Sequence, residues 1–336
     1  MSQLNGKRLT DGYERQVNYL RLSVTDQCNL SCRYCAPFRP GIRPRLPGDR
    51  LMSFEEMHRL VRIGVDLGIS KVRLTGGEPL CRKGITRFIR DLARMPGIRD
   101  IGLTTNGTLL AAMAPELMSA GLTRINISLD TLNAGRFRDI TGKNAWHRVW
   151  EGIMAALDLG FAPVKINTVV MRGINDDEVV DMARLSRQYP LHVRFIEYMP
   201  IGPDSRAVSG RFISGRDLKR RIGREGELIP VVRGAFDGPA RRFKFKGAPG
   251  EIGFISSMSD HFCRRCNRMR LTAKGFLRPC LLADDQVKLV HRLRDGWTDA
   301  QLRDLFFRAL SMKQGDHGLS SNGHGRLKTK MVQIGG

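Results

Sequence analysis

The chain has 336 residues, 41% of them hydrophobic, which is enough to bury a sizeable core in one large domain and a smaller one. No apolar run approaches the roughly 20 residues of a membrane span, and Met1 to Arg15 lack the apolar stretch of a secretory signal, so we expect a cytoplasmic protein without membrane segments. The net charge of +23 is dispersed and has no aromatic-rich basic stripe, which predicts affinity for anions such as phosphates and no specific nucleic-acid recognition.

Six short apolar runs, rich in β-branched residues and bounded by turn residues, predict buried strands. In chain order they are Tyr19–Val24, Val72–Leu74, Ile101–Leu103, Ile125–Leu129, Val164–Val170 and Val193–Ile196. Amphipathic helices are expected between them. Ser53 to Glu56 predicts a capping box that opens a helix ending at Gly68, and Asn175 to Glu178 predicts the start of another. This alternation predicts right-handed βαβ units in an incomplete six-stranded barrel.

The pattern changes from Glu227 onward. Three apolar runs separated by Gly and Pro predict antiparallel strands at Leu228–Val232, Arg242–Phe245 and Ile252–Ile255. The expected fold class is therefore α/β: an incomplete (β/α)6 barrel over residues 1–225, followed by a smaller region with antiparallel strands over residues 226–336.

Six of the seven cysteines form two triplets, Cys28-x3-Cys32-x2-Cys35 and Cys263-x2-Cys266-x13-Cys280. Three thiolates can bind three irons of a four-iron cluster and leave the fourth iron open, whereas an electron-transfer cluster usually takes four cysteines. A zinc ion with a histidine as fourth ligand is the alternative. No His follows the first triplet, but His261 lies two residues before the second. The remaining thiol, Cys81, is expected to pack in the core.

Residues that follow the predicted strands are candidates for function, because the active sites of α/β barrels lie at the carboxyl ends of the strands. These segments are the first cysteine triplet, Thr75–Pro79, Thr104–Gly107, Ser128–Asp130 and Glu197–Pro200. The Gly-Gly pair at 76–77 allows a ligand to approach the backbone closely, although an ordinary strand-to-helix turn is the alternative.

The motif CNLSCRYC followed by TGGEP resembles the radical S-adenosylmethionine superfamily. The second triplet, in HFCRRCNRMRLTAKGFLRPC, resembles the GTP 3′,8-cyclase family of molybdenum cofactor biosynthesis. That resemblance covers nearly the whole chain and includes LRLSVTDQCN, KVRLTGGEPL, NISLDTL, RFIEYMPIG and the terminal Gly-Gly. It implies a partial (β/α)6 barrel, two [4Fe-4S] clusters, S-adenosylmethionine as cofactor and GTP as substrate.

The resemblance also implies the reaction. A 5′-deoxyadenosyl radical takes the ribose 3′ hydrogen of GTP, and the product is (8S)-3′,8-cyclo-7,8-dihydroguanosine 5′-triphosphate, in the first step of molybdenum cofactor biosynthesis. The expected partners are an external one-electron donor and a downstream enzyme that forms cyclic pyranopterin. A homodimer is expected as well.

The roles of individual residues follow from the same resemblance. The first cluster would be ligated by Cys28, Cys32 and Cys35, and the second by Cys263, Cys266 and Cys280. S-adenosylmethionine would contact Tyr34, Gly77, Ser128 and Met199, although Met199 at an apolar strand end is also typical of a core residue. The catalytic residues would be Arg21, Arg268 and Arg270, and the substrate-binding residues Arg21, Arg73, Thr104, Lys165, Arg268, Met269 and Arg270. Cations inside a barrel need an anion, and GTP carries about four negative charges.

Two other interpretations stay open on the sequence alone. One is a radical enzyme of the same superfamily that modifies peptides, which would be expected to carry more C-terminal cysteines and a peptide groove. The other is a basic nucleic-acid-binding protein stabilised by zinc.

The sequence also predicts a role for the end of the chain. Chain ends are commonly frayed, but two glycines can enter a crowded pocket where a Cβ would clash. We therefore expect the tail from Lys330 to Gly336 to reach the active site and to help arrange its arginines.

Overall fold

The computed structural model describes residues 8–35, 51–201, 210–234, 237–319 and 327–335. Its strands form one 12-stranded sheet in the order β12-β11-β10-β1-β2-β3-β4-β5-β6-β9-β8-β7. The bounds are β1 (Tyr19–Ser23), β2 (Lys71–Thr75), β3 (Asp100–Thr105), β4 (Arg124–Ser128), β5 (Val164–Val170), β6 (Leu191–Glu197), β7 (Leu228–Pro230), β8 (Arg241–Phe245), β9 (Glu251–Ile255), β10 (Arg268–Leu271), β11 (Phe276–Arg278) and β12 (Val287–Lys288).

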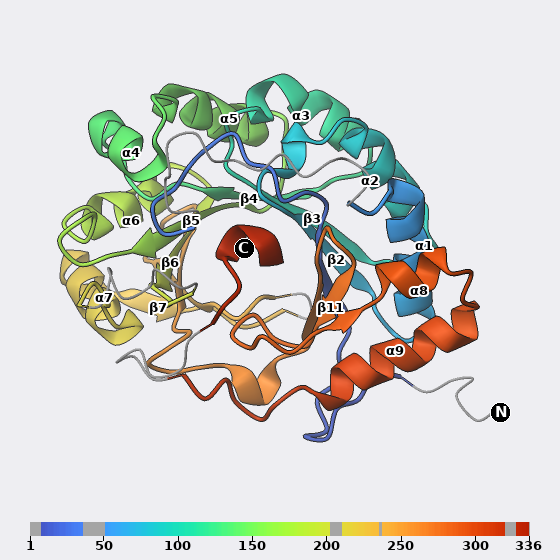
Figure 1. Ribbon diagram of the computed structural model, residues 1–336. Coiled ribbons are helices and arrows are strands. Elements are labelled where there is room, and N and C mark those ends of the chain that lie inside the picture. Colours follow the sequence, from blue (N-terminus) through green and yellow to red (C-terminus); the bar gives the residue numbers. More distant parts are fainter. Residues whose placement is uncertain (1–7, 36–50, 202–209, 235–236, 320–326, 336) are drawn as a thin grey trace.

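All six predicted barrel strands form, as β1 to β6, and each pairs in parallel with the next along the chain. Helices lie around the outside of the sheet, except for the last one, which lies inside it (Figure 1). Their bounds are α1 (Phe54–Asp66), α2 (Ile85–Ala93), α3 (Leu110–Ser119), α4 (Ala134–Thr141), α5 (Trp146–Asp158), α6 (Val179–Gln188), α7 (Gly215–Ile222), α8 (Val290–Arg294), α9 (Asp299–Ser311) and α10 (Met331–Ile334).

Alternation along the strands separates the two faces of the sheet. In β1, Leu20 and Leu22 are fully buried in the core beneath the helices, and Arg21 takes the opposite, inward face. Polar and charged side chains can therefore line the barrel interior while the outer face forms the hydrophobic core.

The C-terminal strands extend the barrel sheet at both edges. The three predicted antiparallel strands form as β7, β8 and β9, but β9 also pairs in parallel with β6. At the other edge β10 pairs in parallel with β1, and β11 and β12 continue the sheet antiparallel. Because β12 and β7 end the strand order without pairing to each other, the sheet stays open, which confirms the partial barrel. The domain boundary between residues 225 and 226 stays a prediction.

One of the two predicted helix starts is confirmed. The side chain of Ser53 accepts from the amide of Glu56, whose own side chain accepts from the amide of Ser53, and α1 ends just before Gly68. The start predicted at Asn175 is wrong, because α6 begins at Val179. Asn175 is instead buried and donates to the carbonyls of Asp130 and Val169, so it joins the ends of β4 and β5.

The predicted core position of Cys81 is also wrong. The 3₁₀ turn Pro79–Cys81 places Leu80 in the core and leaves the thiol of Cys81 exposed. Among the described residues, no helix combines the length and apolarity needed to cross a bilayer.

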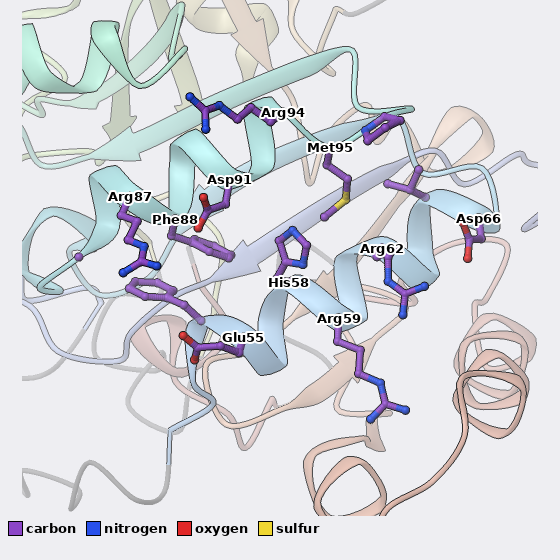
Figure 2. Close-up of a pocket in the computed structure, with 14 residues that line it drawn as sticks. Glu55, His58, Arg59, Arg62, Asp66, Arg87, Phe88, Asp91, Arg94 and Met95 are labelled. Carbon is purple, nitrogen blue, oxygen red and sulfur yellow. The ribbon is translucent and has the colours of Figure 1, made fainter.

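A groove of about 980 Å³ lies outside the barrel between α1 and α2 (Figure 2). Phe88 and Met95 contribute apolar surface, and His58 and several charged side chains line it. None of the site residues predicted from the sequence lines this groove, so the candidate site lies elsewhere.

Candidate functional site

The first cysteine triplet lies on the loop that follows β1, and backbone contacts fix this loop. The amide of Ser31 donates to the carbonyl of Thr141 at 2.8 Å, and the amide of Arg33 donates to the carbonyl of Ile140 at 3.0 Å. These bonds connect the loop to the end of α4. The thiol of Cys28 accepts from the amide of Leu30 at 3.4 Å.

The Gly-Gly turn after β2 packs its backbone against the same loop. A Cβ on Gly77 would lie 2.2 Å from the carbonyl oxygen of Gln27, and one on Gly76 would lie 2.6 Å from that of Thr25. Any side chain would therefore separate the two loops. The amide of Gly77 donates to the carbonyl of Thr25, so the predicted contact with S-adenosylmethionine falls to the rest of its backbone and stays a prediction.

Glu78 and Asn106 hold the loop of the first triplet in place, a role that was not predicted from the sequence. The buried Glu78 carboxylate accepts from the Asn106 amide at 2.6 Å and from the Thr105 hydroxyl at 2.7 Å. The Asn106 side chain then donates to Asn29 at 2.7 Å and to the thiol of Cys28 at 3.8 Å. The only signal in the sequence was the position of both residues just after strand ends.

The other residues predicted to contact S-adenosylmethionine lie around the same strand ends. The hydroxyl of Tyr34 donates to the carboxylate of Asp130 at 2.6 Å, and Asp130 lies just beyond β4. Ser128 is the last residue of β4. Burial raises the pKa of Asp130 to about 6. Met199 follows β6 and packs against a small apolar cluster that includes Ile334 of the tail.

The second triplet lies at the opposite end of the β1–β10 strand pair from the first triplet. Cys263 and Cys266 precede β10, and Cys280 follows β11, which runs antiparallel to β10. Because β10 runs parallel to β1, the first triplet lies beyond the carboxyl end of this pair and the second lies at its amino end. The five residues of β1 place the two triplets on the order of 15 Å apart.

The thiols of the two triplets differ in how readily they ionise. Burial disfavours the Cys266 thiolate, but Arg268 and Lys313 outweigh this and lower its pKa to about 7. Burial and the neighbouring Cys28 raise the pKa of Cys35 to about 12, and burial and Cys280 raise that of Cys263 to about 11. Bound iron must therefore displace these protons. Within the described part of the chain, no three His, Cys, Asp or Glu side chains meet closely enough to share one metal ion. In a four-iron cluster each cysteine binds its own iron, so its three thiols stand around the cluster.

Three arginines lie side by side on the inward faces of β10, β1 and β2, between the two triplets. Arg21 is in register with Arg270 on one side and with Arg73 on the other. Burial lowers the pKa of Arg270 well below its usual value and, with the nearby arginines, lowers that of Arg21 to about 10. Gly102 on β3 provides the space for Arg73, because a Cβ there would lie 2.6 Å from its guanidinium carbon.

Further cations continue this layer around the barrel. Lys165 on β5 and Arg194 on β6 are buried, and no ion pair in the described chain involves either. Burial and the charges of Arg194 and Arg73 lower the pKa of Lys165 to about 6. Arg194 was not predicted as a site residue, although a charged residue inside an apolar strand was a usable signal. Such a layer is stable only when an anion balances it.

Buried polar atoms without partners also favour a polar ligand in this interior. Among the described residues, the Thr104 hydroxyl and the side-chain carbonyl oxygens of Asn126 and Asn167 are buried with no hydrogen-bond partner. Each unsatisfied group costs about 1–3 kcal/mol, so a polar ligand would stabilise this interior. Thr104 and Asn126 are in register, as are Asn126 and Lys165.

The three predicted substrate residues of β10 divide between its two faces. Arg268 and Arg270 share a face, and the guanidinium of Arg268 stacks on the ring of Phe262 at 4.5 Å. Met269 alternates to the other face, where its side chain joins the hydrophobic core. Its predicted contact with substrate stays a prediction.

The C-terminal tail enters the barrel, as predicted. α10 lies at the centre of the ring of strands (Figure 1), and the carbonyl of Gly335 accepts from the guanidinium of Arg270 at 2.8 Å. A Cβ on Gly335 would lie 2.6 Å from the hydroxyl of Thr75 and 2.8 Å from the Cβ of Ser23. Gly336 lies outside the described residues.

Comparison with known proteins identifies the chain. Residues 22–186 match the Radical SAM superfamily, and residues 191–319 match Molybdenum Cofactor Synthesis C. GTP 3′,8-cyclases of Moorella thermoacetica and Syntrophomonas wolfei are each 48% identical to it, over 98% of this chain and 100% of theirs. The chain belongs to the GTP 3′,8-cyclase family. This membership decides against a zinc-stabilised nucleic-acid-binding protein.

Two solved structures share the fold of this cyclase-family chain. Streptococcus suis SuiB bound to S-adenosylmethionine superimposes with a TM-score of 0.62 at 15% identity, over 88% of this chain and 68% of SuiB. The protein anSMEcpe with bound AdoMet gives 0.56 at 14% identity, over 89% of this chain and 81% of its own. At such identity the likeness concerns the fold alone.

Proposed function

We propose that this protein converts GTP to (8S)-3′,8-cyclo-7,8-dihydroguanosine 5′-triphosphate, the first step of molybdenum cofactor biosynthesis. The observation that carries the proposal is the layer of buried cations between two three-cysteine sites on the β1–β10 strand pair. Two [4Fe-4S] clusters and S-adenosylmethionine are the cofactors, held by Cys28, Cys32 and Cys35 and by Cys263, Cys266 and Cys280.

The cofactors supply a 5′-deoxyadenosyl radical when bound, and the residues of this chain position the nucleotide for it. Arg21, Arg268 and Arg270 would bind the substrate along one side of the interior. Arg73, Lys165 and Arg194 would complete the cationic layer around the phosphates, and Thr104 would donate to the nucleotide. The tail occupies the middle of the barrel, where it excludes water from a radical reaction.

One anaerobic assay tests the function. The reconstituted protein is incubated with S-adenosylmethionine, GTP and a chemical reductant, and the nucleotide product is identified by mass spectrometry and NMR. We expect a cyclic dihydro-GTP and 5′-deoxyadenosine. Cleavage of S-adenosylmethionine with GTP left unchanged would refute the proposal.

The remaining partners are further parts of the proposal. We expect an external one-electron donor, a downstream enzyme that forms cyclic pyranopterin from the product, a homodimer and a cytoplasmic location. The electron donor and the downstream enzyme follow from the family resemblance.

The arginines of β10 give a quantitative prediction. Arg268→Ala or Arg270→Ala should weaken GTP binding by about 1.5–3 kcal/mol, because each removes hydrogen bonds between a guanidinium and a phosphate. Lys at either position should restore binding only in part, since it lacks the planar fork of donors. Titration calorimetry measures the effect. Arg264→Ala, an exposed arginine of the same segment, is the control. Unchanged affinity in both variants would place the triphosphate elsewhere.

The charge of the interior predicts that GTP binding takes up protons near pH 7.5. Lys165 has a pKa of about 6, so most of it is neutral without ligand. Burial disfavours ionisation of Tyr19, but Arg73 and Arg21 outweigh this and lower its pKa to about 7. A polyanion raises both pKa values, and each group then binds more protons at constant pH. Calorimetry in two buffers of different ionisation enthalpy measures the uptake.

Lys165→Met should remove part of this proton uptake. A binding enthalpy that does not depend on the buffer in the wild-type protein would contradict the prediction.

A further inference from the structure

A buried lysine next to the second triplet has no role in the proposed reaction so far. Lys313 lies just after α9 and is only 5% exposed. Its ammonium donates to the thiol of Cys266 at 3.5 Å, to the carbonyl of Arg268 at 3.1 Å and to the carbonyl of Pro279 at 2.8 Å. These three contacts use all three of its hydrogen-bond donors.

The contacts of Lys313 connect the parts of the chain that carry the second triplet. Cys266 lies two residues before Arg268, which is the first residue of β10, and Pro279 directly precedes Cys280. One ammonium therefore fixes two cysteine-bearing segments relative to each other. It also fixes them relative to the strand that carries Arg268 and Arg270.

A second buried cation supports the remaining ligand, and it provides an internal comparison. Arg15 donates to the carbonyl of Cys263 at 2.8 Å, but its charge is balanced by Asp11, which lies 2.6 Å away. In the described chain no carboxylate pairs with Lys313. A buried ammonium without a carboxylate is costly unless another negative group faces it, and here the facing group is the sulfur of Cys266.

We infer that Lys313 is a positioning residue for the second cluster: it holds Cys266 and the Pro279–Cys280 turn in the geometry that binds iron, and its positive charge makes the bound cluster easier to reduce. The inference rests on the second cluster of the proposed function. Hydrogen bonds to the sulfurs and the local charge are two of the factors that set the potential of an iron–sulfur cluster. Removing a positive charge disfavours the added electron, so the potential becomes more negative.

Three substitutions test this in the full-length, anaerobically reconstituted protein. Lys313→Met removes the charge and the hydrogen bonds, Lys313→Gln keeps a donor without the charge, and Lys313→Arg keeps both. Lys288→Met, at an exposed lysine of β12, is the control. Each is also made with Cys28, Cys32 and Cys35 replaced by Ala, so that the midpoint potential and the electron paramagnetic resonance spectrum report the second cluster alone.

We expect Lys313→Met to lower iron from about eight toward about four per chain. The second cluster that remains in the Met and Gln variants should have a more negative midpoint potential, and the Arg variant should restore iron and most of the potential. Cleavage of S-adenosylmethionine at the first cluster should persist in every variant that keeps Cys28, Cys32 and Cys35.

The outcomes separate this inference from the proposed function. A wild-type protein that binds no second cluster would refute the function before any substitution is compared. If the wild-type protein binds the cluster and the Met and Gln variants match it in iron, spectrum and potential, the role of Lys313 is refuted. An Arg variant as defective as Lys313→Met would refute the part played by the charge.

Discussion

Replacing cysteines of the two triplets should produce two different losses. Ala at Cys28, Cys32 or Cys35 should abolish cleavage of S-adenosylmethionine, because this triplet provides the open iron to which the cofactor binds. Ala at Cys263, Cys266 or Cys280 should leave some cleavage but no cyclised nucleotide. The two triplets lie at opposite ends of the β1–β10 pair, so the loss of one cluster leaves the residues around the other cluster in place.

The measurements for this prediction are iron content, 5′-deoxyadenosine and cyclic nucleotide in the same samples. About eight irons are expected in the wild-type chain and about four in each triplet variant. Cys81→Ala is the matched control, because this exposed cysteine lies in neither triplet and should change none of the three quantities. Cyclisation at the wild-type level in the second-triplet variants would contradict the substrate role of that cluster.

The strands and the cysteine sites could be predicted because their signals are local. Strands β1 to β6 are short apolar runs between turn residues, and the triplets have fixed spacing. The helix start predicted at Asn175 failed because Asn caps helices and also joins loops, and here its amide is used by Asp130 and Val169. The prediction that Cys81 packs in the core failed because a short turn places Leu80 there and leaves the thiol outside.

Pairing across the sheet could not be predicted, and it determines the site. Nothing near Arg270 in the sequence shows that β10 lies beside β1, about 250 residues earlier, yet that register places Arg270 next to Arg21. Lys313 is a comparable case. On the sequence it is one more lysine after a helix, which is usually solvated, and only the packing of α9 brings it to Cys266.

Gly335 should be intolerant of any side chain. Its φ of +72° lies in the left-handed region, and a Cβ would meet Thr75 and Ser23 at distances shorter than real contacts. Gly335→Ala should therefore displace the tail and remove the hydrogen bond from Arg270, and cyclisation should fall strongly. Deleting Gly335 and Gly336 should have the same effect. Because the cysteines lie on other segments, iron content and cleavage of S-adenosylmethionine should stay near the wild-type level.

Gly318→Ala separates crowding from backbone strain. Gly318 also has a left-handed φ, of +61°, but a Cβ there would meet nothing within 4 Å. Both substitutions thus carry the left-handed penalty, about 1–2 kcal/mol, and only the one at Gly335 carries a clash inside the barrel. Thermal unfolding measures the shared penalty, and the cyclisation assay measures the difference. Full cyclase activity in the Gly335 variants would mean that the tail occupies the barrel without arranging Arg270 for the reaction.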